Sequence, residues 1–128
     1  RRIAKLHALK AKSETPQAHL EHVIGDYFEQ IRQRPQGGCS SLNAAIELGR
    51  QCDEVNEMAL KLKEEMRQFL ATLLKEAGYS DVENRSHQLQ LIFNSALTTA
   101  VFRPADEVIA HSQALIDLLL REGRSSHE

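Results

Sequence analysis

The chain has 128 residues, of which 41% are hydrophobic and 27% are charged, and its formal net charge at pH 7 is −2. These values describe one ordinary globular domain, long enough to bury a core but too short to hold two. A nearly neutral charge argues against a large nucleic-acid surface on this chain, because domains that bind nucleic acids are usually basic.

The first predicted element is a basic, weakly amphipathic helix over residues 1–12. The chain begins inside this helical pattern and without an initiator Met, so we expect a longer protein with a further N-terminal part. Thr15 is suited to cap the next helix, with Pro16 at its first position. A regular apolar stripe follows, and Pro35 and the pair Gly37–Gly38 end it.

The middle of the chain predicts a short helix and then a long one. The short helix is expected within residues 39–49, where Gly49 marks its end. Asp53 is placed to cap the longest and most regular helix, which Gly78 closes.

Two helices follow in the C-terminal third. Asp81 is placed to cap a helix over residues 82–102, and Pro104 starts the last helix, which ends at Gly123. Residues 124–128 are expected to be a frayed tail. The sequence therefore predicts an all-α fold, a bundle of about six helices.

One stretch of the chain is unusually poor in charge. No Asp, Glu, Lys or Arg occurs between Ser86 and Phe102, whereas a surface helix normally has a charged face. The stretch is too short and too rich in amides and hydroxyls for a membrane span. We therefore expect burial on two sides, against the chain's own helices and against a second copy. A monomer in which this is simply the central core helix remains the alternative.

The last predicted helix has an apolar face wider than one intramolecular contact needs. Two such helices from each of two subunits would form a four-helix interface around a two-fold axis. The predicted interface residues are Leu91, Asn94, Thr98, Val101, Val108, Ser112, Leu115, Ile116 and Leu119.

The run over residues 37–78 resembles the middle of the C-terminal domain of TetR-type transcriptional repressors. The residues that carry the resemblance are Gly38, Cys39, Asn43, Glu47 and Asp53. The closing helices, 82–102 and 104–122, resemble that family's dimerisation pair, so the resemblance covers nearly the whole chain. The helix-turn-helix head by which the family is usually recognised does not occur in this sequence.

The resemblance implies that residues 1–12 are a linker helix from a missing DNA-binding head. Residues 13–123 would then be an effector-binding and dimerisation domain. The implied partners are a second copy, a small and mostly apolar effector, and operator DNA through the absent head only. We expect neither a membrane contact nor a cofactor.

The resemblance also implies an effector cavity inside the helical body. The candidate lining residues are Tyr27, Phe28, Ile31, Leu42, Met58, Leu62, Met66, Phe69, Phe93 and Leu97. Met and Phe suit an adaptable apolar pocket, but the same spacing is also typical of plain core. Tyr27 and Asn94 are the polar groups that need a partner if buried.

Signals for catalysis or metal binding are weak. No nucleophile elbow, phosphate loop or HExxH motif occurs, so we expect no enzymatic activity. His19, His22 and Asp26 share a helix face, but no third ligand is identifiable, and solvated histidines are the favoured interpretation, so no metal is expected.

The two cysteines, Cys39 and Cys52, form neither a CxxC pair nor a metal-binding spacing. Free thiols are typical of a reducing compartment, which predicts a cytoplasmic protein. Two other functions remain open: a helical dimeric scaffold that binds no ligand, and a small helical enzyme or metal protein.

Overall fold

The computed structural model describes residues 2–33 and 53–123. In chain order the elements are α1 (Arg2–Ala8), the 3-10 helix η1 (Leu9–Lys12), α2 (Pro16–Gln33), α4 (Asp53–Glu76), α5 (Val82–Thr99) and α6 (Ala105–Gly123). No β-strand is present in this part of the chain, which confirms the all-α prediction. The predicted short helix within 39–49 lies outside the described residues.

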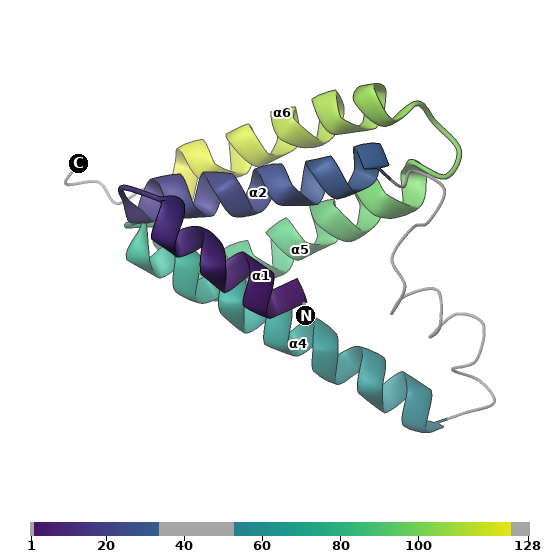
Figure 1. Ribbon diagram of the computed structural model, residues 1–128, viewed down its shortest axis with the longest axis horizontal. Helices are drawn as coiled ribbons and strands as arrows, with labels where there is room; N and C mark the ends of the chain where they lie inside the picture. The colour runs from purple at the N-terminus through teal and green to yellow at the C-terminus, as the bar shows by residue number, and fades with distance from the viewer. Residues whose placement is uncertain (1, 34–52, 124–128) are drawn as a thin grey trace.

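Helix α2 lies between α6 on one side and α4 and α5 on the other, while α1 crosses the bundle near its surface (Figure 1). Because α2 contacts all three of these helices, its buried side chains occupy the centre of the core. They are His19, Leu20, Val23, Ile24, Tyr27, Phe28 and Ile31. In the described ranges, no helix is long and apolar enough to cross a membrane.

The start of α2 follows from its sequence. The Thr15 hydroxyl accepts a hydrogen bond from the Ala18 N–H at 3.0 Å, which satisfies one of the amides that a helix start leaves without a partner. Pro16 occupies the first helical position, where its missing N–H has no cost. Both features confirm the predicted start.

The end of α4 depends on Gly78, whose φ of 92° few residues with a side chain adopt. The Tyr79 N–H donates to the Leu74 carbonyl, and the Gly78 N–H donates to the Lys75 carbonyl. These two bonds are the Schellman arrangement. Tyr79 is thereby turned back into the core, where it is buried.

The boundaries of α5 differ slightly from those predicted. Asp81 precedes the helix but has a left-handed φ of 50° and makes no side-chain capping bond. Its carboxylate instead accepts from the Asn84 amide. At the other end α5 stops at Thr99 rather than at Phe102, because the Val101 and Phe102 N–H groups bond in tighter turns to carbonyls three residues earlier.

The N-terminal segment packs against α2. Leu6 is fully buried, and its carbonyl accepts a 3.0 Å hydrogen bond from the buried His19 ring. An ion pair of 3.2 Å joins Lys5 to Asp26. Helix α1 is therefore attached to the bundle by apolar, hydrogen-bonded and ionic contacts.

Candidate functional site

The structure describes nine of the ten predicted effector-site residues and places them in three environments. Leu42 lies outside the described residues, and Met66 is half-buried. Met58 and Leu62, on the N-terminal half of α4, are exposed. The buried candidates are Tyr27, Phe28, Ile31, Phe69, Phe93 and Leu97. The prediction that these residues line a cavity stays a prediction.

An aromatic contact joins three of the buried candidates. The rings of Tyr27 and Phe93 stack with centroids 3.9 Å apart and planes 6° apart. Phe28 meets Phe93 edge-on at 6.5 Å. These rings pack α2 directly against α5, so this contact is filled with side chains.

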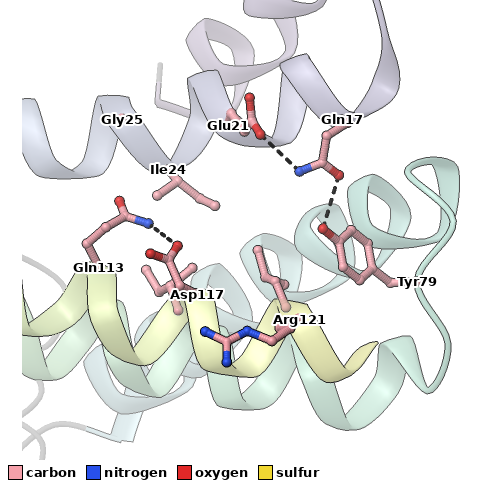
Figure 2. A pocket seen from close by; sticks show the side chains of 10 residues that line it. Gln17, Glu21, Ile24, Gly25, Tyr79, Gln113, Asp117 and Arg121 are labelled. Atoms are coloured by element: carbon pink, nitrogen blue, oxygen red, sulfur yellow. Dashed lines mark hydrogen bonds between the residues drawn. The ribbon is translucent and has the colours of Figure 1, made fainter. Parts of the chain in front are cut away.

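A cavity of about 460 Å³ opens instead between α2 and α6, and Tyr79 lies at one end of it (Figure 2). Its lining residues are Gln17, Glu21, Ile24, Gly25, Tyr79, Gln113, Ile116, Asp117, Leu120 and Arg121. We call this the α2–α6 groove. None of the nine predicted effector-site residues that the structure describes lines it.

Hydrogen bonds organise the polar side of the α2–α6 groove. Gln17 donates to the Glu21 carboxylate at 3.1 Å and accepts from the Tyr79 hydroxyl at 3.1 Å. On the facing helix, Gln113 donates to the Asp117 carboxylate at 2.8 Å. Each helix therefore presents a carboxylate that an amide one turn earlier orients (Figure 2).

Apolar periodicity does not predict the α2–α6 groove, because much of its lining is polar. A signal was present: Gly25 removes a side chain from the middle of α2. A Cβ added to Gly25 would meet nothing within 4 Å. The helical spacing between Gln17 and Glu21 recurs between Gln113 and Asp117, but only the fold brings the two pairs together.

The predicted dimer-interface residues divide between surface and core. Those on the surface are Leu91, Thr98 and Leu115, those half-buried are Asn94, Val101 and Leu119, and those buried within the chain are Val108, Ser112 and Ile116. Asn94 accepts a 3.0 Å hydrogen bond from Lys63, so its amide contacts α4 of its own chain. Whether any of these residues meets a second copy stays a prediction.

Large apolar side chains nevertheless remain exposed on the last two helices. Leu91 on α5 is 67% exposed, and Phe102, just after α5, is 80% exposed. On α6, Leu115 and Leu118 are each more than half exposed. Apolar groups concentrated on neighbouring elements are typical of a protein–protein interface.

A buried arginine that sequence reasoning did not identify joins α4 to α5. Arg67 bonds to Glu64 in its own helix, to Glu83 at 3.1 Å and to the Ser86 hydroxyl at 3.2 Å. The hydrogen bond from Arg67 lowers the pKa of Glu64 to about 2, from an ordinary value of 4.5. The Glu64 hydrogen bond in turn raises the pKa of Arg67. These groups form a structural network in which Glu64 and Arg67 both remain ionised at neutral pH.

The histidines considered as metal ligands have other partners. The His19 ring bonds to the Leu6 carbonyl, and His22 lies 2.8 Å from the Ser13 hydroxyl. Asp26 pairs with Lys5. Within residues 2–33 and 53–123, no three His, Cys, Asp or Glu side chains form a group that could hold a metal ion.

The fold has a counterpart among solved structures. A crystal structure of a TetR-family transcriptional regulator from Streptomyces coelicolor superposes with a TM-score of 0.86 at 19% sequence identity. The match covers 95% of this chain and 65% of that protein, so the chain spans somewhat less than two thirds of its length. No protein-family model matches the sequence, and no curated protein proved similar to it. The chain therefore has a TetR-like all-α fold.

Proposed function

We propose that this chain is the regulatory and dimerisation body of a cytoplasmic TetR-like transcriptional regulator. The observation that carries the proposal is the TM-score of 0.86 over 95% of the chain. A fold can host several functions, so the fold alone does not define the role. Two features of the described helices support it further: the outer face of α5, and the attachment of α1.

The outer face of α5 supports a homodimer. Its exposed residues are Glu83 and Asn84 in the first turn, then His87, Gln88, Leu91, Ser95 and Thr98, and the exposed Phe102 follows the helix. From His87 onward these residues recur at helical spacing and include no Asp, Glu, Lys or Arg. A solvated face of this length normally carries charge. With the exposed Leu115 and Leu118 of α6, this face forms the proposed surface that two copies bury around a two-fold axis.

The attachment of α1 supports a route for regulation. In this proposal α1 connects the body to a helix-turn-helix head, and an apolar effector binds between α2, α4 and α5. The effector would favour one packing of α2, which α1 follows through the Leu6–His19 bond. Because a ligand shifts an equilibrium only if it binds the two states unequally, one packing must bind it better.

Dimerisation is tested by native mass spectrometry of the 128-residue chain. The expected species contains two 14.4 kDa chains. Leu91→Arg should weaken the dimer at least ~10-fold, because it places a charge in the buried centre of the interface. The matched control is Leu60→Arg, because Leu60 is 64% exposed and lies on α4. A monomeric parent chain, or equal weakening by both variants, would contradict the dimer.

Regulation is tested with the natural full-length protein. First, genomic DNA fragments that bind to this protein are selected. Second, the purified protein is denatured, and the small molecules that it releases are identified by mass spectrometry. At least one of these molecules should release the selected DNA. If every such molecule leaves DNA binding unchanged, the effector role is wrong even if the dimer exists.

A dimeric scaffold without a ligand is the second candidate. The Tyr27–Phe93 stack favours it, because closely packed rings leave little room between α2 and α5. This candidate predicts a dimer that carries no additional mass in native mass spectra. It also predicts that apolar compounds leave the unfolding temperature of the dimer unchanged.

A further inference from the structure

We propose that the α2–α6 groove is a binding site for a small organic cation, in which an ammonium group is carried on a short apolar chain. The site is separate from the proposed effector cavity between α2, α4 and α5, and it does not depend on the dimer. The argument rests on three properties of the groove: its floor, its charge and its position on α6.

The floor of the groove is apolar and preformed. Ile24 and Ile116 are buried, and Leu120 is half-buried beside them. Gly25 leaves the wall of α2 without a side chain, and no atom lies within 4 Å of where its Cβ would be. The volume of about 460 Å³ lies within the range of small-molecule sites, roughly 300–1,000 Å³. A short alkyl chain therefore fits this floor.

The charge of the groove favours a cation. Glu21 on α2 and Asp117 on α6 supply two carboxylates, whereas Arg121 is the only cationic residue among the described residues of the lining. The Gln17 and Gln113 amides donate to these carboxylates and hold them in place. Each carboxylate has further acceptor positions, since two oxygens offer about four lone-pair directions. An ammonium group, which has three N–H donors, is the complementary partner.

No ion pair joins either carboxylate to a cationic side chain in the described part of the chain. The two carboxylates come from different helices, Glu21 from α2 and Asp117 from α6. A carboxylate-bearing ligand would instead meet two like charges and one opposite charge, which disfavours it.

The proposed dimer surface and the groove lie largely on different sides of α6. At helical spacing, Leu115 lies roughly opposite Gln113 and Asp117. Leu118, which belongs to the same proposed surface, lies nearer the groove, one turn before Arg121. Ligand binding and dimer formation can be measured independently.

The test uses three probes with one tail and different heads: octylammonium, 1-octanol and octanoate. Each is titrated into the 128-residue chain, labelled with ¹⁵N, and amide resonances are followed by NMR. Octylammonium should give saturable shifts that centre on Gly25, Tyr79 and Gln113. Octanol should bind more weakly, and octanoate most weakly.

Three variants determine the sign of the charge effect. Glu21→Gln and Asp117→Asn should each raise the Kd for octylammonium about threefold, because each removes one exposed charge pair. Arg121→Gln should lower this Kd about twofold, because it removes a repelling charge. Asp106→Asn is the matched control, since Asp106 lies at the far end of α6 and pairs with Arg32. It should leave the Kd unchanged.

Gly25→Leu tests the apolar floor without changing charge. Because the added side chain would occupy the groove, octylammonium should lose saturable binding while the amide spectrum remains that of the folded chain. Octanoate that binds more tightly than octylammonium, and that Arg121→Gln weakens, would overturn the proposal in favour of an anion site. Shifts that centre on Tyr27 and Phe93, or no saturable shift at all, would also overturn it. None of these results bears on dimerisation or DNA release.

Discussion

Helix α2 makes two contacts that differ in kind. Against α5 it packs aromatic rings, with Tyr27 and Phe93 stacked at 3.9 Å. Against α6, the groove places amides and carboxylates beside Ile24 and Gly25. The contact of α2 with α5 is thus filled with side chains, whereas its contact with α6 leaves an open groove. The comparison teaches that the size and polarity of a few side chains, rather than the helix arrangement, decide where a ligand can enter.

The filled contact should carry most of the stability. Phe93→Ala removes a ring that is buried and stacked, so it should lower the free energy of unfolding by about 3–5 kcal/mol. Leu60→Ala is the control for losing an exposed apolar side chain and should change it by less than about 0.5 kcal/mol. Denaturant unfolding at one protein concentration measures both. A small loss for Phe93→Ala would mean that the contact is loosely packed.

The Arg67 network is a third kind of contact, filled but polar. Arg67→Met should lower the free energy of unfolding by about 1–3 kcal/mol, because the buried Ser86 hydroxyl loses a donor and two carboxylates lose their partner. The same denaturant measurement checks this value. An unchanged or higher stability would show that apolar packing at this position substitutes fully for the ion pairs.

The same network should make stability depend on pH. Arg67 lowers the pKa of Glu64 to about 2 in the folded chain, against 4.5 ordinarily. A lowered pKa contributes stability that is fully present above the unfolded value and is lost as pH falls toward the folded one. Stability should therefore decline between pH 4.5 and 2. Glu64→Gln should show a shallower decline over this interval, and parallel curves would contradict the assignment.

The smallest expected effects come from two glycines with opposite signs. Gly25 lies in the interior of α2 with open space around it, so Gly25→Ala should stabilise the chain by about 0.4–1 kcal/mol. Gly78 has a φ of 92°, so Gly78→Ala should destabilise by about 1 kcal/mol or more. Thermal unfolding of both variants gives the sign of each change in stability. If both substitutions change the stability in the same direction, this account of Gly78 is wrong.

Helix starts and stops were predictable because their causes are local. Thr15 and Pro16 act within one turn, and Gly78 ends α4 because of its own backbone conformation. The sequence predicted the end of α5 at Phe102, three residues too late. Uncharged residues continue after Thr99, but the backbone has already left the helix there.

The groove and the buried arginine were not predictable in this way. Arg67 resembles its charged neighbours in sequence, and only α5 supplies Glu83 and Ser86 as partners. Likewise, Asp117 and Glu21 line the same groove only because α6 packs along α2. Local periodicity shows which side of a helix is apolar, but it does not show which distant helix will cover it.

Tyr79 has two roles that no single helix reveals. It is the residue that the end of α4 turns into the core, and its hydroxyl holds Gln17 at the end of the groove. A mutation that alters this ring therefore changes the chain reversal and the shape of the α2–α6 groove together. A substitution at Tyr79 that changes the groove therefore also changes the stability of the helical bundle.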